Sequence, residues 1–415
     1  MQQEKTPDRQ SKLRFSSEEL TVLAILFSAT IVVSTGIQMG NALFPALSRL
    51  VNVPISTVTL LVSVWAFTEL LSPLFGPPSD RYGHTTFVLI GLGTFTLGNF
   101  LCMVAPNFLA LLTFQVLVGL GYGVFSFSAS AVIGDVFAYD VRARAMGIVR
   151  VAVSVTALIG VPVAAAIADW ATARGSFGTV GGIGLVVLAL ALARLPRQSR
   201  QAIHTQSTEA KANLGQKLRE VAHQRSAIVS LLTLGVWALI PTGVFIYLAA
   251  WLEKAFVLTE TQIGLAFSVA GVGGLIGNAF TAAWADRLGK KRSAVLGLLV
   301  LSTMALLLPH LPSLIAVLCC FAVFVAALEV NSASFATLMT ELTPTSRGTL
   351  MSLVTLAIGI GTGAAPLLLR PLWESGGYAA VTLALGIVGL GVAIIIGLFV
   401  SEPKASPVAS GQEDK

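Results

Sequence analysis

The chain has 415 residues, of which 55% are hydrophobic and only 11% are charged, and its mean hydropathy is +0.84. So few charges cannot cover the surface of a soluble protein, so the composition excludes the soluble classes and predicts a membrane-embedded protein. The formal net charge of +6 does not indicate nucleic-acid binding, because the basic residues lie in short loops between apolar runs, where they set orientation in the membrane. The cysteines Cys102, Cys319 and Cys320 lie inside apolar runs and indicate neither a disulfide framework nor a metal site.

Twelve apolar runs approach the length that a membrane-spanning helix needs, which is about 20 residues. They cover residues 20–45, 56–77, 86–105, 108–134, 146–168, 177–193, 226–250, 262–283, 293–308, 313–338, 349–369 and 379–400. The polar residues before the first run end without a small-residue cleavage site, which predicts a cytoplasmic tail rather than a signal peptide.

The connecting segments divide the chain into five parts. Most loops are short, but a polar segment separates the sixth run from the seventh. We therefore expect a tail at 1–19, a six-helix half at 20–193, a linker at 194–225, a second six-helix half at 226–400 and a tail at 401–415. The linker could lie on the inner leaflet as a basic amphipathic helix, but we favour a simple tether between the halves.

The two halves repeat each other. Asp-Arg-x-Gly begins at Asp80 and again at Asp286, an offset of 206 (286 − 80). Further pairs keep nearly this offset: Arg142 with Arg347 and Met146 with Met351 at 205, Pro162 with Pro366 at 204, and Trp170 with Trp373 at 203. Markers that share one register indicate an internal duplication.

Lysine and arginine are distributed unequally between alternate loops. The side that holds both termini carries 22 of them and the other side carries 4. By the positive-inside rule both termini lie in the cytoplasm. We expect a multi-pass protein of the plasma membrane, in a bacterium the inner membrane.

Both Asp-Arg-x-Gly loops resemble loops of the major facilitator superfamily of secondary transporters. Gly76-Pro77-Pro78-Ser79-Asp80-Arg81-Tyr82-Gly83 is similar to the family pattern Gly-x-x-x-Asp-Arg-x-Gly between helices 2 and 3. The resemblance covers the whole chain. It implies an all-α membrane protein with twelve transmembrane helices in two six-helix halves, in which helices 1, 4, 7 and 10 line a central cavity and helices 3, 6, 9 and 12 face lipid.

The resemblance also implies that these loops act as conformational latches. The latch residues expected from it, with ionic partners at the ends of helices 4 and 10, are Gly76, Asp80, Arg81, Gly83, Asp135, Asp286, Arg287, Gly289, Glu341 and Arg347. His84 departs from the family, which usually has a basic residue at this position. A histidine there predicts a weaker or pH-sensitive latch, although a solvated loop residue is the simpler interpretation.

Two carboxylates lie inside apolar runs, where a charge costs several kcal/mol and therefore marks a functional site. They are Glu69 and Glu329. Glu69 and Gly76 share nearly one helical face, and the resemblance places Gly76 against helix 11, so we expect Glu69 at the interface between the halves. We expect Glu69 to carry a coupling proton and Glu329 to attract a cationic substrate. The alternative for both is a structural glutamate that links helices.

The substrate cavity is expected to combine aromatic and amide side chains. Its candidates are Gln38, Asn41, Trp65, Gln115, Phe127, Trp237, Tyr247 and Asn331. The polar residues of the first run, Gln38 and Asn41 among them, could orient a polar substrate or equally cement helix packing. Gln115 stands where drug/proton antiporters of the family commonly have an arginine, so a mechanism that needs this arginine is excluded.

Glycine and proline in the fifth and eleventh runs predict bending. The residues are Gly160, Pro162, Gly363 and Pro366, and they loosely resemble the glycine-proline signature of efflux members. Close helix packing is the alternative. For Arg150 we favour a side chain that reaches the inner membrane surface over an ion pair in the cavity.

We therefore expect a secondary transporter that exports a small hydrophobic or cationic molecule against protons by alternating access. A proton-coupled importer or facilitator of a polar solute is the alternative, and a membrane sensor without transport is a rival from another class. The sequence indicates no enzyme, no metal and no cofactor. The expected partners are a small-molecule substrate, protons and the lipid bilayer, with no nucleic acid, and we expect a monomer.

Overall fold

The computed structural model describes residues 15–196, 219, 221, 223–342 and 347–399. Within this part, the side chains of Tyr139, Arg225, residues 284–288, 340–342, and residues 347 and 348 are not described. Most of the predicted linker, residues 1–14 of the first predicted tail and the whole of the last predicted tail lie outside the described residues. So do the side chains of four expected latch residues, Asp286, Arg287, Glu341 and Arg347.

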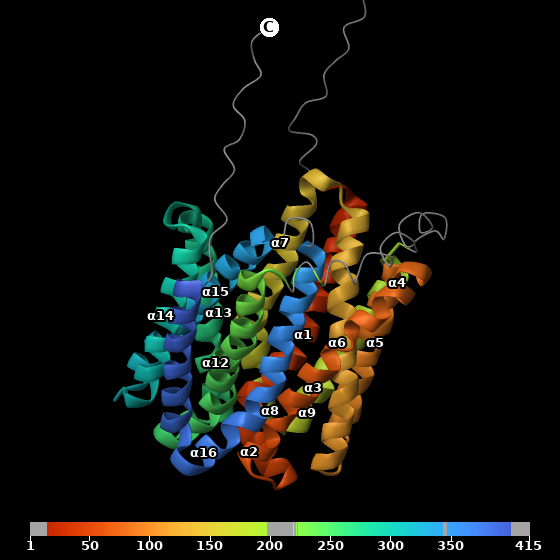
Figure 1. Cartoon of the computed structure of the whole chain (residues 1–415). Coiled ribbons are helices and arrows are strands. Elements are labelled where there is room, and N and C mark those ends of the chain that lie inside the picture. The colour runs from red at the N-terminus through yellow and green to blue at the C-terminus, as the bar shows by residue number, and fades with distance from the viewer. Residues whose placement is uncertain (1–14, 197–218, 220, 222, 343–346, 400–415) are drawn as a thin grey trace, which may run out of the picture.

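The described residues of both halves are helical (Figure 1). The first half contains α1 (Ser17–Val51), α2 (Ile55–Val58), α3 (Leu60–Glu69), η2 (Ser72–Phe75), α4 (Gly76–Tyr82), α5 (His84–Met103), α6 (Phe108–Val136), α7 (Tyr139–Val155), η3 (Thr156–Gly160), α8 (Val161–Trp170) and α9 (Ala173–Arg194). The second half contains α12 (Arg225–Phe256), α13 (Glu260–Leu288), α14 (Lys290–Leu307), η5 (Leu308–His310), α15 (Leu314–Leu342) and α16 (Arg347–Phe399).

The described residues form eleven candidate membrane spans, of which the last accounts for two crossings. This span, Thr349–Phe399, has 51 residues, more than twice the length that one crossing requires. Its backbone leaves the helical conformation at Gly377, with φ 63° and ψ −153°. The break separates the apolar runs predicted at 349–369 and 379–400. The prediction of an all-α membrane protein with twelve spans in two halves is confirmed.

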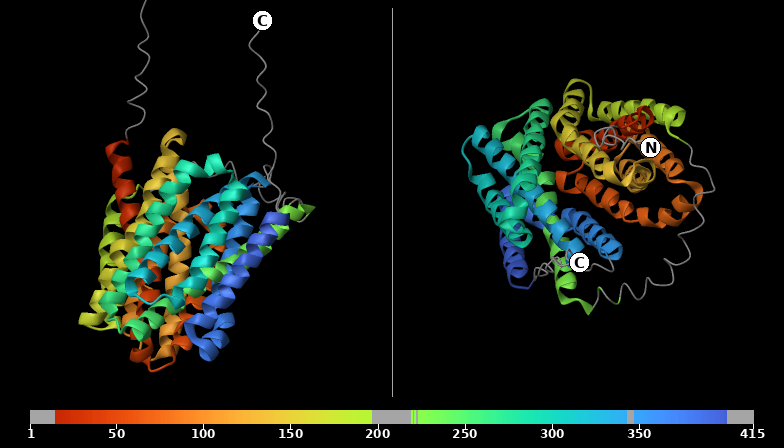
Figure 2. Two further views of the ribbon diagram at one scale, coloured as in Figure 1. Left: turned by 90° about the vertical axis from the view of Figure 1, so that its left-hand side faces the viewer. Right: turned by 90° about the horizontal axis from the view of Figure 1, so that it is seen from above.

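The two ends of the helix bundle can be told apart by the parts of the chain that lie there. The start of α1 and the end of α16 lie at the same end as α4, and α2 lies at the opposite end (Figure 1). We call these ends the terminal face and the α2 face. The two halves lie side by side when the molecule is seen from the terminal face (Figure 2).

The most extensive contacts between the halves are those of α3 with α16, of α8 and η3 with α13, and of α1 with α12, and smaller ones join α1 and α7 to α13 and α2 to α16. The second contact passes through an irregular segment, because η3 is a π-helix at Thr156–Gly160. A Cβ atom on Gly160 would collide with Thr35 of α1, and Pro162 begins α8. Such π-helical turns inside a helix often occur at functional sites. This interruption coincides with the bend predicted for the fifth span.

The two Asp-Arg-x-Gly loops have the same backbone geometry. Gly83 ends α4 and begins α5 with φ 94° and ψ 135°, and Gly289 ends α13 and begins α14 with φ 85° and ψ 143°. Side chains rarely tolerate positive φ values, so both turns need glycine. The matching geometry at an offset of 206 (289 − 83) is what the duplication predicts.

Candidate functional site

Glu69 lies at the end of α3, where the second span changes from an α-helix to a 3-10 segment. Its backbone packs on α6, because a Cβ atom on Gly123 would lie 3.2 Å from both the Cα and the carbonyl oxygen of Glu69. Its carboxylate acts electrostatically on Tyr122 of α6. The Tyr122 ring in turn meets Trp65 edge to face, with 6.1 Å between centroids. Glu69 therefore belongs to a cluster inside the first half.

The expectation that Glu69 faces the interface between the halves is wrong. Phe67 and Leu70 make the contact with α16, and a Cβ atom on Gly363 would lie 2.7 Å from the Phe67 ring. At about 100° per residue, these two residues lie on a different side of the helix from Glu69. Gly76 also packs within its own half, since its Cβ position is 3.5 Å from the ring of Phe127 on α6.

Glu329 lies within α15 and meets two other helices. Its Oε2 accepts a hydrogen bond from Nδ2 of Asn278 on α13 at 3.3 Å. A Cβ atom on Gly277 would lie 2.9 Å from the Cβ of Glu329, so glycine allows α13 and α15 to approach this closely. A Cβ atom on Gly274 would lie 3.9 Å from both the Cγ of Glu329 and the Oγ of Ser154 on α7. Glu329 is therefore placed where the first half meets the second.

Arg150 also belongs to the surroundings of Glu329. Its positive charge acts on the Glu329 carboxylate, and it lies one helical turn before Ser154, on the same side of α7. Arg150 is exposed. Both the favoured interpretation, in which this side chain reaches the inner membrane surface, and the alternative of an ion pair in the cavity stay predictions.

Asn331, which we expect to line the substrate cavity, links two helices of the second half. Its side chain is fully buried, and its Nδ2 donates a hydrogen bond of 2.6 Å to the carbonyl oxygen of Ala294 on α14. A Cβ atom on Gly297 of α14 would lie 3.2 Å from the Cβ of Asn331. Asn331 thus holds α15 against α14, which is the role that polar side chains commonly have between membrane helices.

The other expected cavity residues are dispersed. Phe127 is 41% exposed beside Gly76, and Tyr247 is fully buried and stacks on Trp373 with 4.6 Å between centroids. Trp237 is buried as well. Gln38 and Asn41 are half-buried on α1.

Trp65 and Gln115 share a small cavity between α1, the second span and α6. The residues that line it are Gly36, Ile37, Gly40, Phe44, Leu47, Leu61, Val62, Trp65 and Gln115. Gln115 is only 6% exposed, and its Oε1 has no hydrogen-bond partner among the described residues. The cavity has a volume of about 10 Å³, which is room for one water molecule that could donate a hydrogen bond to this acceptor.

His84 connects two expected latch residues in the first Asp-Arg-x-Gly loop. Its Nδ1 is 2.8 Å from the Oγ of Ser79, and its Nε2 lies 3.7 Å from Asp80 and 3.8 Å from Asp135. The side chain of His84 is 19% exposed, so the interpretation as a solvated loop residue is wrong. Arg81 lies with its guanidinium 5.5 Å from the centre of the Tyr82 ring.

Tyr122, Asn278 and the polar contacts between the halves at the α2 face were not predicted from the sequence. Asn278 could have been found, because it is an amide inside an apolar run with Gly274 one turn before it and Gly277 directly before it. Tyr122 carried no such signal, since its contact with Glu69 depends on how α3 and α6 pack. Pro366 lies inside α16, and Gly363 forms part of the contact between the halves.

Comparison with known proteins agrees with this architecture. The family model of the Major Facilitator Superfamily matches residues 26–250 and 239–415. The MFS-type transporter YceJ of Bacillus subtilis (strain 168) is 25% identical over 339 residues, which are 81% of this chain and 85% of YceJ. Multidrug resistance protein 2 of the same organism is 26% identical over 145 residues, which are 35% of this chain and 36% of that protein.

A solved structure has the same fold. It is that of a bacterial homolog of the human lysosomal transporter Spinster, in an inward-facing and unoccupied conformation. It superposes with a TM-score of 0.74 at 16% identity, over 93% of this chain and 96% of that chain. Because the family model covers both halves, the chain is a transporter that belongs to the major facilitator superfamily.

Proposed function

We propose that this transporter exports small hydrophobic or cationic molecules in exchange for protons, by alternating access of one central site. The terminal face would lie in the cytoplasm, because 22 of the 26 basic residues are on that side. The similarity to multidrug resistance protein 2 supports export over import, although it covers only part of the chain.

The observation that carries the proposal is the position of Glu329. It is a carboxylate in a membrane span, it lies beside Arg150 of the other half, and it is hydrogen-bonded to Asn278. Such a group can bind either a proton or a cationic substrate, but not both at once. When the halves move, its distance from Arg150 changes, and so does its preference for a charge. This couples proton movement to the exchange of conformations.

The assignment of roles changes with the structure. We expected Glu69 to carry the proton because of its presumed place at the interface, and that reason no longer holds. We therefore propose Glu329 as the coupling carboxylate. Glu69, which packs against α6 inside the first half, would form the wall of the site together with Trp65 and Gln115.

We also propose that the Asp-Arg-x-Gly loop forms a latch at the terminal face. His84 lies between the two carboxylates, since its Nε2 is 3.7 Å from Oδ1 of Asp80 and 3.8 Å from Oδ2 of Asp135. A protonated His84 would attract both carboxylates and a neutral one would not. The latch would then respond to the pH on this face.

The test is flux in proteoliposomes, with ethidium as a fluorescent hydrophobic cation. A pH gradient should drive ethidium movement by the natural protein. Glu329→Gln cannot release a proton, so it should lower pH-driven flux to the level of protein-free vesicles. It should retain ethidium exchange without a gradient, because exchange needs no net proton movement, but with a higher KM for ethidium, because the charge that attracts the cation is lost.

Glu69→Gln is the matched comparison, since it also neutralises a carboxylate in a span of the same protein. We expect it to retain at least a third of the pH-driven flux. Full pH-driven flux in Glu329→Gln would overturn the coupling role. Flux of ethidium that is insensitive to the gradient in the natural protein would favour a facilitator, the alternative function.

A further inference from the structure

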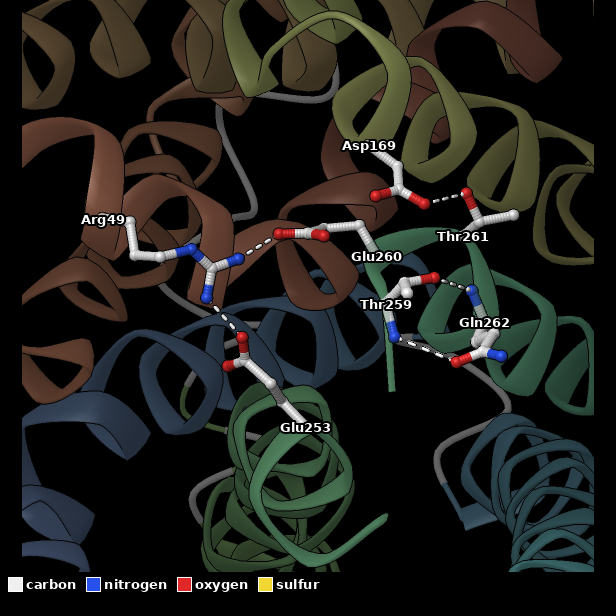
Figure 3. A network of polar contacts seen from close by, with 7 residues as sticks. All are labelled: Arg49, Asp169, Glu253, Thr259, Glu260, Thr261 and Gln262. Carbon is white, nitrogen blue, oxygen red and sulfur yellow. Dashed lines mark hydrogen bonds and ion pairs between the residues drawn. The ribbon is translucent and has the colours of Figure 1, made fainter. Parts of the chain in front are cut away.

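The α2 face closes through polar contacts that join residues of opposite halves. At one edge, Oγ of Ser56 on α2 donates a hydrogen bond to Oε1 of Glu374 on α16, at 2.8 Å. At the other edge, Oγ1 of Thr261 on α13 donates to Oδ2 of Asp169 on α8, at 2.6 Å (Figure 3). Each contact pairs a hydroxyl near a helix start in one half with a carboxylate near a helix end in the other.

These two hydrogen bonds are related by the internal duplication. Ser56 and Thr261 are 205 residues apart (261 − 56), and Asp169 and Glu374 are also 205 apart (374 − 169). The offset equals that of Arg142 and Arg347 (347 − 142). The same type of hydrogen bond, from a hydroxyl of one half to a carboxylate of the other, therefore occurs twice at the interface between the halves.

Arg49, at the end of α1, makes a third polar contact between the halves at this face. Its guanidinium forms ion pairs with Glu253 of α12 and Glu260 of α13, one through each terminal nitrogen (Figure 3). The Arg49 side chain is 53% exposed, while those of Glu253 and Glu260 are 27% and 17% exposed. One side chain of the first half thus forms ion pairs with two helices of the second.

One of the two carboxylates that Arg49 meets, that of Glu260, belongs to a helix start with a fixed conformation. Thr259 and Gln262 form a reciprocal capping box at the start of α13, with hydrogen bonds of 3.4 Å and 3.0 Å (Figure 3). A capping box fixes the first turn of a helix. Glu260 and Thr261 lie within this turn, so both reach the first half from one fixed segment.

The duplication does not repeat the arginine contact. The counterpart of Arg49 is Lys254, 205 residues later (254 − 49). Lys254 lies with its Nζ 5.7 Å from the centre of the Trp373 ring, within its own half. An ammonium group also lacks the planar fork with which a guanidinium binds two carboxylates. The duplication thus repeats the hydrogen bond between a hydroxyl and a carboxylate, but it does not repeat the ion pairs of Arg49.

We propose that Arg49 is the clamp that holds the α2 face closed, and that the two repeat-related hydroxyl bonds are its weaker edges. All three contacts join opposite halves, so a rocking motion that opens this face must break them. They stabilise only the conformation with a closed α2 face, and a contact made in one conformation alone shifts the population toward it. The inference depends on alternating access and is independent of the coupling ion.

The test measures the opening of the α2 face without substrate or a pH gradient. Spin labels are attached at Pro106→Cys and Pro312→Cys, exposed turn positions at this face that are 206 residues apart (312 − 106). The natural cysteines Cys102, Cys319 and Cys320 are replaced by alanine. Pulsed electron paramagnetic resonance on the protein in nanodiscs then gives the distance distribution between the two loops.

Arg49→Gln should raise the fraction at long distance about threefold to tenfold, the range expected when two partly exposed ion pairs are lost. Lys254→Gln is the matched control, since it removes the same charge at the related position, and its distribution should equal that of the natural protein. Arg49→Lys should fall between. Ser56→Ala and Thr261→Ala should each shift the distribution by no more than about twofold, and by similar amounts, since each removes one hydrogen bond.

The proposal is overturned by an unchanged distribution in Arg49→Gln, or by an equal shift in Lys254→Gln. A single symmetric elution peak for each labelled variant controls for folding. Because neither protons nor substrate enter this measurement, its outcome is independent of whether Glu329 carries a proton.

Discussion

Glu69 and Glu329 are both glutamates inside membrane spans, yet their surroundings differ in kind. Glu69 is close to Tyr122 and to the backbone of α6, all within the first half. Glu329 meets Asn278 of its own half and the charge of Arg150 in the other. Burial alone does not distinguish them, because both are half-buried. The difference is whether the neighbours of the carboxylate move relative to it.

This distinction matters under the proton-coupled alternating access that we propose. The halves rock as units, so a group with neighbours in its own half keeps the same environment in every conformation. Its affinity for a proton then stays the same throughout the cycle, so the group cannot couple proton movement to transport. A group at the boundary exchanges neighbours during the cycle. Glu329 satisfies this condition, whereas the contacts described for Glu69 lie within its own half.

The largest effect that separates the two sites is expected from glycine substitutions beside each carboxylate. A Cβ atom at Gly277 would collide with the carbonyl oxygen of Ala326 and lie 2.9 Å from the Cβ of Glu329; one at Gly123 would lie 2.8 Å from the Cβ of Ser72. Each Gly→Ala change should destabilise the fold by about 1–3 kcal/mol through overpacking. Only Gly277→Ala should also lower pH-driven ethidium flux more than tenfold per folded molecule.

Gly134→Ala is the control for both variants. This glycine lies within α6 and has nothing within 4 Å of its Cβ position, so alanine should stabilise the helix by about 0.5–1 kcal/mol. Thermal unfolding in detergent gives the order of the three variants. An unchanged melting temperature in Gly277→Ala would contradict the close contact between α13 and α15.

A smaller effect is expected from Arg150. If its charge competes with a cationic substrate for Glu329, Arg150→Gln should lower the apparent KM for ethidium about twofold to fivefold, which is the range for a partly exposed charge pair. The kcat for exchange should change less. Arg144→Gln removes the same charge from the same helix, where the guanidinium lies 5.3 Å from the centre of the Phe15 ring, and should leave the KM unchanged.

An increase in the KM for ethidium in Arg150→Gln would have the opposite meaning. Arg150 would then assist binding, and an anionic or zwitterionic substrate would become the better hypothesis. A neutral probe of similar size is the control for a charge effect, because its KM should not respond to Arg150 in either case.

The architecture could be predicted from the sequence because its cause is local. The length of each apolar run determines whether it crosses the bilayer, and the repeated Asp-Arg-x-Gly loops require glycine at Gly83 and Gly289 for their positive φ values. The two intramembrane carboxylates were also found from sequence, since a charge inside an apolar run is costly and conspicuous.

The direction in which each side chain points could not be predicted, because partner helices decide it. Glu69 faces α6 since Gly123 gives its backbone room there, while Gly363 receives Phe67 on the other side. The run around Glu69 also changes from α-helix to a 3-10 segment before Gly76, so an extrapolation over one regular helix was inaccurate. The contact of Asn331 could not be predicted for the same reason, as its partner Ala294 lies on another helix.

The smallest effect concerns the polar neighbours of the two carboxylates. Asn278→Leu removes the hydrogen bond of 3.3 Å to Glu329, and Tyr122→Phe removes the hydroxyl near Glu69. A hydrogen bond to a charged group is worth about 1.5–3 kcal/mol when both partners are buried, but Glu329 is half-buried and water can replace part of this energy. We therefore expect Asn278→Leu to reduce pH-driven ethidium flux about threefold, with exchange retained.

Tyr122→Phe should stay within about 1.5-fold of the natural protein in both assays, since any hydrogen bond it makes is of the neutral kind and moves with its own half. Asn278→Asp sharpens the test, because it keeps the shape of the amide but places a second negative charge beside Glu329. If Tyr122→Phe proves more damaging to pH-driven flux than Asn278→Leu, the coupling carboxylate is Glu69 and the boundary between the halves is not what selects it.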